Sequence, residues 1–376
     1  MRIAIYDIRH YEMVHVLFRL FDTPENEILF LISPLLKEKL ISVSGQQMSR
    51  HTIITENPEE SHESFLLKCK KEIEKFKPAF LHCNTIDKDY KYMSRFLKNC
   101  SIPYSITIHN INTWLAPPFT LNRTALQNYY HRKKMVKGSS MLVVQEELFV
   151  SYIHNKNLYK KPVITIPHTL QEEKPVENKN EKIVVSIPGA IDGVRRDIGM
   201  ALDVMEAIHQ KSKQFQFVFA GKVLGHLGEK IWQRVEQLQQ KGLDIQHCYD
   251  EKSNVVFDEQ MKKCDVVFLP LNVKTKYEGI DEIYGTTKVT GVMYDMMRAG
   301  KPGIVPAEMV IPPTMNGSII SYQNKKDLTE KLLALEAQPA ELKKRKQAAL
   351  RESEYYREEA IRQRVIPQIK KYMSAK

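Results

Sequence analysis

The sequence lacks any apolar run long enough to cross a membrane as a helix. Its longest apolar runs, Ile28–Ile32 and Val266–Pro270, have the length of buried strands. The five cysteines are scattered and never form a Cys-x-x-Cys pair, so we expect neither a disulfide framework nor a structural zinc site. The chain enters a strand pattern at Arg2 without the apolar region of a secretory leader. We therefore expect a cytoplasmic protein.

Acidic residues are outnumbered by basic ones. The chain contains 56 Lys and Arg against 45 Asp and Glu, which leaves a formal net charge of +11. This excess favours an anionic partner such as a nucleotide, a lipid phosphate or an acidic membrane surface. The alternative is that much of the charge simply lies on solvated helix surfaces. The basic residues are dispersed, and we see no helix that interleaves them with aromatic residues as a nucleic-acid reader does. We expect no nucleic acid as partner.

The hydrophobic pattern predicts two α/β domains. A chain of 376 residues exceeds one typical core, and short apolar runs alternate with amphipathic helical patterns in both halves. Such alternation is typical of doubly wound parallel sheets, and one helix is expected at His62–Phe76. The expected strands lie near residues 2–8, 27–33, 79–84, 104–109, 141–145, 163–167, 183–189, 215–222, 244–248, 264–270, 302–306 and 318–322.

A polar segment after Leu170 marks the boundary between the halves. We place an N-terminal domain at 1–170, a linker at 171–181 and a C-terminal domain at 182–339. The remainder, 340–376, reads as a helical segment that packs back on the N-terminal domain. Ligands of doubly wound sheets bind at the carboxyl ends of the strands, so we expect the active site in a cleft between the domains.

The stretch Glu282–Lys288 predicts an anion site in front of a helix. Gly285 would let the backbone approach a ligand, and Thr286 or Thr287 would cap the helix. The free N–H groups of the helix and the Lys288 ammonium would then face one point, which suits a phosphate. On these residues alone, an ordinary capped helix with Lys288 in solvent is the alternative.

An ordered set of motifs extends over most of the chain. It comprises the strand at 103–110 that ends in His109, the strand at 163–168, Gly189 with Arg195 and Arg196, the strand end at Gly221, the strand at 264–270 and the turn at 300–302. In order and spacing the set resembles the glycosyltransferases of GT-B fold, in particular the bacterial retaining enzymes. The resemblance implies two Rossmann-like domains: an N-terminal acceptor-side domain and a C-terminal domain that binds the nucleotide sugar.

The resemblance also implies roles for individual residues. His109 would reach toward the donor sugar, and Glu282 would bind sugar or ribose hydroxyls, so these two are the catalytic candidates. A lone histidine at a strand end is often structural, and Glu282 could be a surface acid. One of Arg195 and Arg196 would hold the diphosphate and the other would lie in solvent. The expected donor-binding residues are Gly189, Arg195, Arg196, Gly221, Lys222, Tyr284, Gly285, Thr286, Thr287 and Lys288.

The chemistry explains why cations would be needed. Transfer from a nucleotide sugar breaks an anomeric C–O bond while negative charge accumulates on the leaving diphosphate. A fork-shaped guanidinium suits bidentate contact with that group. We see no Asp-x-Asp loop near the expected diphosphate, so we expect no metal and no cofactor besides the donor itself.

Two departures from the family pattern are visible. The second glutamate of the family's signature is missing, and Thr287, Lys288 and Asp295 instead resemble a subgroup that builds cell-surface polysaccharide. The loop at 7–12 lacks the family's glycine pair.

The leading hypothesis is a metal-independent hexosyltransferase. It would move a sugar to a glycan or lipid-linked acceptor in surface polysaccharide synthesis, with peripheral attachment to an acidic membrane. A noncatalytic GT-B-like partner subunit and a GT-B sugar-nucleotide epimerase are the alternatives.

Overall fold

The computed structural model describes residues 1–171, 181–250 and 255–373. Most of the linker expected at 171–181, namely residues 172–180, lies outside the described residues. The chain divides into two compact units. Unit 1 contains Met1–Leu170, Lys276–Glu282 and Glu358–Lys376, and unit 2 contains Gln171–Thr275 and Ile283–Arg357.

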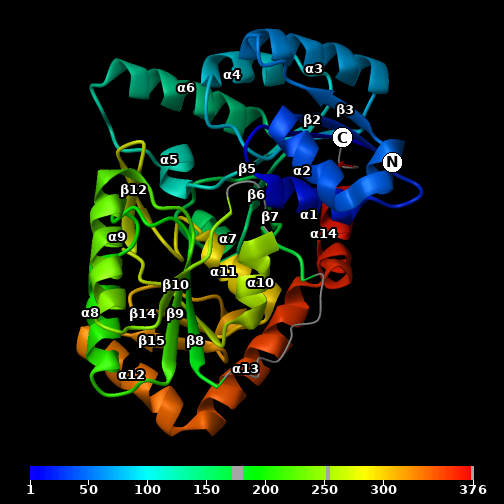
Figure 1. Ribbon diagram of the computed structural model, residues 1–376. Helices are drawn as coiled ribbons and strands as arrows, with labels where there is room; N and C mark the ends of the chain where they lie inside the picture. The colour runs from blue at the N-terminus through cyan, green and yellow to red at the C-terminus, as the bar shows by residue number, and fades with distance from the viewer. Residues whose placement is uncertain (172–180, 251–254, 374–376) are drawn as a thin grey trace. The chain divides into compact units, whose positions relative to one another are not determined.

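Unit 1 is built on a seven-stranded sheet with the order β3-β2-β1-β4-β5-β6-β7, in which the paired strands are parallel (Figure 1). Its order reverses between β1 and β4, which is the switch point where doubly wound sheets bind ligands. The strands are β1 (Arg2–Asp7), β2 (Glu27–Ile32), β3 (Thr52–Thr55), β4 (Phe80–Cys83), β5 (Tyr104–Thr107), β6 (Met141–Val144) and β7 (Val163–Thr165). Six of these were expected; β3 was missed because it is a short edge strand with only two apolar residues.

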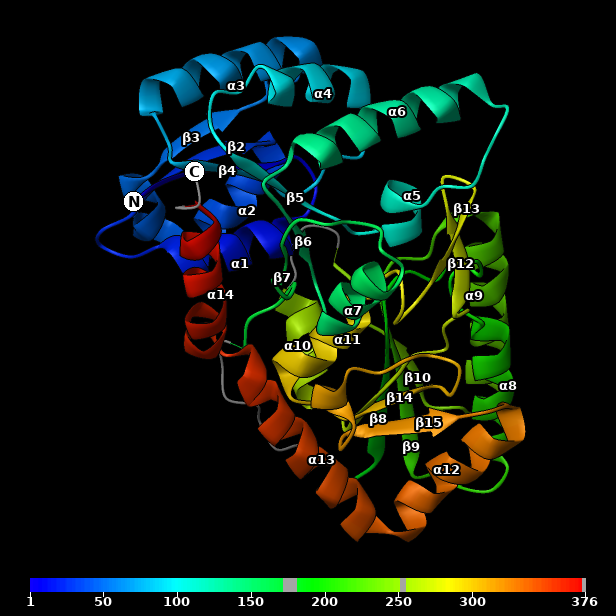
Figure 2. The same cartoon turned by 180° about the vertical axis from the view of Figure 1, so that it is seen from behind.

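Helices surround this sheet, and α3 and α4 lie side by side, as do α4 and α6, in both views (Figures 1 and 2). The predicted helix at His62–Phe76 is confirmed, and the Ser61 hydroxyl caps it by accepting from the Ser64 N–H at 3.2 Å. The helices are α1 (Tyr11–Phe21), α2 (Pro34–Ser44), α3 (His62–Phe76), α4 (Tyr90–Lys98), α5 (Ile111–Leu115), α6 (Arg123–Gly138), α7 (Glu147–Asn155) and α14 (Glu358–Met373), with a 3₁₀ helix at Gly45–Arg50.

Unit 2 contains a six-stranded parallel sheet with the order β10-β9-β8-β11-β14-β15, which reverses between β8 and β11. Every strand expected from the sequence in this half is confirmed. The strands are β8 (Ile183–Pro188), β9 (Phe215–Ala220), β10 (Ile245–His247), β11 (Val266–Phe268), β14 (Gly303–Pro306) and β15 (Ile319–Tyr322). The helices are α8 (Ile198–His209), α9 (Gly225–Gln240), α10 (Val255–Lys263), α11 (Gly291–Ala299), α12 (Lys325–Ala337) and α13 (Pro339–Ser353), with 3₁₀ turns at Pro313–Met315 and Glu354–Tyr356.

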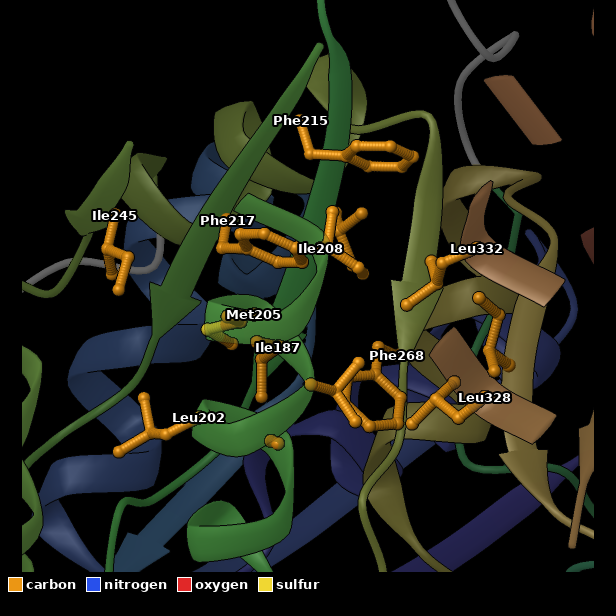
Figure 3. Packing of buried hydrophobic residues seen from close by; sticks show 14 of the residues in the cluster. Ile187, Leu202, Met205, Ile208, Phe215, Phe217, Ile245, Phe268, Leu328 and Leu332 are labelled. Atoms are coloured by element: carbon orange, nitrogen blue, oxygen red, sulfur yellow. The ribbon is translucent and has the colours of Figure 1, made fainter. Parts of the chain in front are cut away.

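The core of unit 2 lies between this sheet and helices α8 and α12 (Figure 3). Phe217 and Phe268 from the strands pack against Met205 and Ile208 of α8 and Leu328 of α12. Each such side chain contributes about 1.5–3 kcal/mol when it leaves water. Helices α8 and α9 lie on one face of the sheet and α10 and α11 on the other (Figures 1 and 2). This packing fixes the loops at the strand ends.

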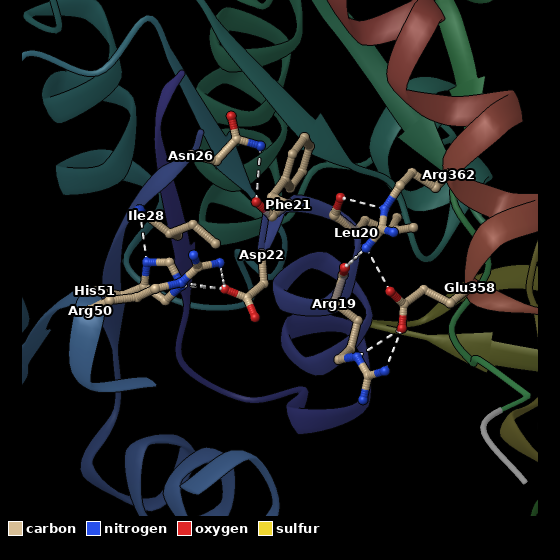
Figure 4. Close-up of polar contacts among 10 residues, drawn as sticks. All are labelled: Arg19, Leu20, Phe21, Asp22, Asn26, Ile28, Arg50, His51, Glu358 and Arg362. Carbon is tan, nitrogen blue, oxygen red and sulfur yellow. Dashed lines mark hydrogen bonds and ion pairs between the residues drawn. The ribbon is translucent and has the colours of Figure 1, made fainter. Parts of the chain in front are cut away.

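The C-terminal segment expected at 340–376 is divided in the structure. Helix α13 belongs to unit 2, whereas α14 belongs to unit 1. Polar contacts hold α14 to α1: Arg19 pairs with Glu358 at 2.5 Å, and the Arg362 guanidinium donates to the Arg19 carbonyl at 2.7 Å (Figure 4).

A two-stranded sheet, for which the sequence analysis listed no strand, contains residues of both units. It consists of β12 (Lys274–Tyr277) and β13 (Ile280–Ile283), and its tip, Lys276–Glu282, belongs to unit 1. The Glu278 carboxylate in this tip pairs with Arg132 of α6 at 3.0 Å and accepts from the Tyr90 hydroxyl at 2.8 Å. Among the described residues, no helix is both long enough and apolar enough to span a bilayer.

Candidate active site

The switch point of unit 2 is formed by the loop after β8 and the residues after β11. The Asp197 N–H donates to the Pro270 carbonyl at 2.7 Å, and the Asn272 N–H donates to the Arg195 carbonyl at 3.1 Å. These bonds fasten the loop from Gly189 to Asp197 beside the carboxyl ends of the two strands. The Asp197 side chain also caps α8, because it accepts from the Met200 N–H at 2.9 Å.

Arg196 is the buried cation of this loop. Its side chain lies over the Gly189 backbone, and only 8% of its surface is exposed. One guanidinium nitrogen donates to the Ala190 carbonyl at 3.1 Å. Within residues 1–171, 181–250 and 255–373, no carboxylate forms an ion pair with it. Burial and then the nearby Arg195 lower the pKa of the Arg196 guanidinium below its usual value.

Arg195 has a different environment, since it is exposed and paired. Its guanidinium donates to the Asp192 carboxylate at 2.6 Å. Asp192 also accepts from the N–H groups of Val194 and Arg195, at 3.0 and 3.1 Å. Burial acts to raise the pKa of Asp192, but these hydrogen bonds outweigh it and the pKa is lowered. Asp192 therefore orients Arg195, a role that the sequence reading missed; the Asp-Gly dipeptide is the available signal.

Two glycines make room for this arrangement. Gly189 has a φ of +96°, and a Cβ there would overlap the Arg196 guanidinium. A Cβ at Gly221, which follows β9, would overlap the Gly189 carbonyl. Both positions therefore need glycine for close approach. The adjacent Lys222 is partly buried, and its carbonyl accepts from the Ile191 N–H at 2.9 Å.

The turn at Tyr284–Lys288 is built differently from the sequence expectation. Helix α11 begins at Gly291 with Thr290 as N-cap, so the prediction that Thr286 or Thr287 caps this helix is wrong. The Thr287 hydroxyl instead accepts from the Ile283 N–H at 2.8 Å. The Ile283 carbonyl accepts from the N–H groups of residues 286, 287 and 288, which closes the turn on itself. The N–H groups of residues 286–288 are therefore satisfied within the turn, and they do not belong to the N-terminus of α11.

Other residues of the turn lie near the arginines. Tyr284 is buried; burial raises the pKa of its hydroxyl, and Arg195 and Arg196 act in the opposite direction. Gly285 has a φ of +81°, and a Cβ there would overlap the Val310 carbonyl. Lys288 is partly buried and pairs with Tyr284 in an isolated bridge. The structure thus brings Arg195, Arg196 and Tyr284 together in unit 2.

In unit 1, a polar network occupies the switch point between β1 and β4. The buried Asp7 carboxylate accepts from the Arg9 N–H at 2.7 Å, the His10 N–H at 3.1 Å and the Thr85 hydroxyl at 3.1 Å. Burial raises the pKa of Asp7, while His10 and the hydrogen bonds oppose that rise. The network holds the loop after β1 and thereby places His10.

His109 follows β5 at the same edge of the sheet. Its Nε2 donates to the Asn84 carbonyl at 3.0 Å. The rings of His10 and His168 lie 4.8 and 5.2 Å from the His109 ring, so three imidazoles gather at this edge. Burial and then His10 lower the pKa of His168 to about 3, which leaves that ring neutral at physiological pH. The sequence reading gave no role to His10 or His168, although each follows the end of a strand.

Glu282 is fully buried and engaged with protein groups. Its carboxylate accepts from the Thr113 N–H and hydroxyl, each at 2.8 Å, and from the Asn112 N–H at 3.4 Å. These N–H groups belong to the first turn of α5, so Glu282 caps a helix that is remote in sequence. Its contact with a sugar stays a prediction, as do the sites expected at the other residues.

Among residues 1–171, 181–250 and 255–373, no group of three or more His, Cys, Asp or Glu side chains is placed to hold a metal ion.

Solved structures share this architecture over the full chain. HepE from Anabaena, solved with UDP-glucose, matches with a TM-score of 0.67 and 12% identity over 99% of this chain and 100% of its own. The chain has the GT-B fold. A glycosyltransferase from Rickettsia africae matches with a TM-score of 0.66 and 11% identity over 100% and 99% of the two chains. The lipopolysaccharide outer core galactosyltransferase WaaB matches with a TM-score of 0.61 and 13% identity over 99% of both chains. No protein-family model matches the sequence, and no curated protein does.

Proposed function

We propose that this GT-B protein is a glycosyltransferase that uses a nucleoside diphosphate sugar as donor. The observation that carries the proposal is the buried Arg196 guanidinium over Gly189, which has no ion-pair partner among the described residues. A buried cation is costly unless an anion completes its environment. A diphosphate at the carboxyl end of β8 would supply that anion. HepE, which shares the fold, was solved with UDP-glucose, and this supports the same class of donor.

The proposed chemistry follows from the charges. When the anomeric C–O bond breaks, its electron pair moves to the leaving diphosphate oxygen. N–H donors that already point at this oxygen bind the transition state more tightly than the substrate. A single donor of this kind contributes on the order of 10²–10³ in rate. Arg196 is the residue that we assign to this role, with Arg195 and Lys288 as further cations and no metal required.

The other predicted residues have supporting parts in the proposal. Gly189 and Gly221 let the backbone approach the diphosphate, and Lys222, Tyr284, Gly285, Thr286 and Thr287 belong to the donor pocket. His109 would hydrogen-bond the donor sugar. Its Nε2 donates to a carbonyl and its Nδ1 lies 3.5 Å from the Gln145 amide nitrogen, so a sugar hydroxyl at Nδ1 would replace that long contact.

We propose a surface glycan or a lipid-linked glycan as the acceptor, and a cytoplasmic location with peripheral attachment to the membrane. The fold shared with WaaB, a lipopolysaccharide galactosyltransferase, supports this choice, and so does the net charge of +11. Basic proteins are attracted to anionic lipid surfaces.

Calorimetry tests the donor class. The purified chain is titrated in EDTA with a panel of nucleoside diphosphates and nucleoside diphosphate sugars. Slow hydrolysis of each bound nucleotide sugar is then followed by the nucleoside diphosphate that it releases. We expect one base to be preferred, and we expect binding to fall in the Arg196→Gln variant. If no nucleotide sugar binds, or if the variant binds as tightly as the wild type, the proposal is wrong.

A noncatalytic GT-B-like subunit remains the second candidate because of Glu282. Its carboxylate is occupied by the first turn of α5, so a residue expected to contact sugar has a structural use. Such a subunit would bind the nucleotide sugar without cleaving it. Release of nucleoside diphosphate in the presence of acceptor decides between the two candidates.

A further inference from the structure

We infer that one side of unit 1 docks on a membrane surface made of anionic phospholipids. This docking face consists of the loop at 116–122 and the outward side of α6. The inference deepens the membrane attachment proposed above and does not depend on the identity of the donor.

The loop carries an exposed apolar tip. Phe119 and Leu121 are 85% and 86% exposed, the two highest values among the exposed large apolar side chains. Pro117 and Pro118 precede them, and residues 116–122 contain no charged side chain. Large apolar side chains that stay in water on an uncharged loop mark an interaction site. Insertion at the boundary between headgroups and acyl chains is the use that fits Phe and Leu.

Helix α6 continues the docking face with aromatic and basic residues. Leu126 and Tyr130 are exposed, and Lys133, Lys134 and Lys137 follow on the same side, because residues four positions apart share one face of a helix. The Lys134 ammonium lies 4.2 Å from the centre of the Tyr130 ring. Aromatic rings beside cations are typical of side chains at the membrane interface. The sequence analysis found no helix that interleaves basic and aromatic residues, and α6 is such a helix.

The stretch of sequence that contains the docking face has no acidic residue. From Tyr90 to Gln145 the chain has eight Lys and Arg and no Asp or Glu. Helix α4, which packs beside α6, lies in this stretch. Arg95 is paired with Glu63 and Arg132 with Glu278. In the part of the chain that the structure describes, no acid pairs with the three lysines of the face. Exposed lysines without an acidic partner of this kind favour anionic lipid headgroups.

The apolar tip favours a membrane over a nucleic acid or an acidic peptide. A polyanion needs cations along its path, and its affinity comes from phosphate contacts. Phe119 and Leu121 lie on the loop that precedes the lysines of α6. Contact with a phosphate backbone would not remove these two apolar side chains from water. A bilayer uses both parts, since the tip enters the interface and the lysines contact the headgroups.

Vesicle sedimentation with the full chain tests the inference. Phosphatidylcholine vesicles with and without phosphatidylglycerol are compared, and two variants are made: F119S/L121S and K133Q/K134Q/K137Q. The matched control is L35S/V43S, which changes two apolar residues of α2 that are 60% and 58% exposed. We expect salt-sensitive binding to the anionic vesicles alone. Each lysine should contribute roughly fivefold in affinity, and the apolar pair at least about tenfold. The control should bind like the wild type.

The outcomes separate the alternatives. Absence of binding to anionic vesicles, or unchanged binding in both variants, overturns the inference. Loss of binding in L35S/V43S alone would place the membrane contact on α2 and would also overturn it. If the lysine variant loses binding while F119S/L121S does not, and RNA competes with the vesicles, the face is a polyanion site instead. Calorimetry with the nucleotide panel is run on the same variants, so failure of the proposed function is seen separately.

Discussion

The variant Arg196→Met separates two effects of the buried guanidinium: its cost to the stability of the free protein and its contribution to nucleotide binding. In the ligand-free protein, the Arg196 guanidinium is buried and donates one described hydrogen bond, to the Ala190 carbonyl. Methionine keeps much of the side-chain volume and removes the charge. The variant loses a hydrogen bond that contributes about 1 kcal/mol, and it also loses the larger desolvation cost of the cation. We therefore expect the free energy of unfolding without ligand to stay equal or to rise.

The effect on ligand binding has the opposite sign. Each charge-assisted hydrogen bond to a diphosphate contributes about 1.5–3 kcal/mol, so the loss of the guanidinium should weaken the nucleotide at least about tenfold. A ligand present at one hundred times its Kd stabilises the wild type by about 2.7 kcal/mol. After a thirtyfold loss of affinity, the same concentration would stabilise the variant by only about 0.9 kcal/mol.

Thermal unfolding with and without the preferred nucleotide measures both effects. Arg195→Met is the matched comparison, since that arginine is exposed and already paired with Asp192. We expect it to weaken binding less than Arg196→Met does. The reasoning is refuted if Arg196→Met destabilises the free protein by several kcal/mol, or if Arg195→Met is the variant that loses the ligand.

Three further predictions concern stability. Glu282→Gln should lower the free energy of unfolding by about 1–2 kcal/mol, because a charged helix cap is lost; a variant with unchanged stability in urea would contradict the capping role. Glu278→Ala should cost about 3 kcal/mol, since it leaves the buried Arg132 cation unpaired, and Glu278→Ala combined with Arg132→Met should recover part of the loss. Burial lowers the pKa values of His82 and His168 to about 3, below their unfolded values, so the unfolded chain binds more protons between pH 6.5 and 3. Stability should therefore be full above pH 6.5 and fall by about 1.4 kcal/mol per pH unit for each histidine as the solution is acidified, and His82→Gln should make the fall less steep.

The loops of the site show where sequence reasoning succeeds. Gly189, Arg195 and Arg196 follow a buried strand, so their place at a carboxyl end could be inferred from local pattern alone. Which of the two arginines is buried could not be inferred, because neighbouring residues differ only in the direction of their side chains. The same limit applies to Glu282, whose partners Asn112 and Thr113 are remote in sequence.

By itself, the sequence determined the doubly wound class of both units. Strands that are buried on both faces must be apolar throughout, and helices that lie on them must be amphipathic, so both leave periodic signals in the chain. The tertiary structure decided the rest: the edge strand β3, the pairing of β12 with β13, the late start of α11, and the gathering of His10, His109 and His168. The edge strand and the three histidines depend on partners from distant segments, whose contacts exist only after the chain has folded. The β12–β13 pair and the start of α11 depend on short-range backbone hydrogen bonds, which leave no hydrophobic period in the sequence.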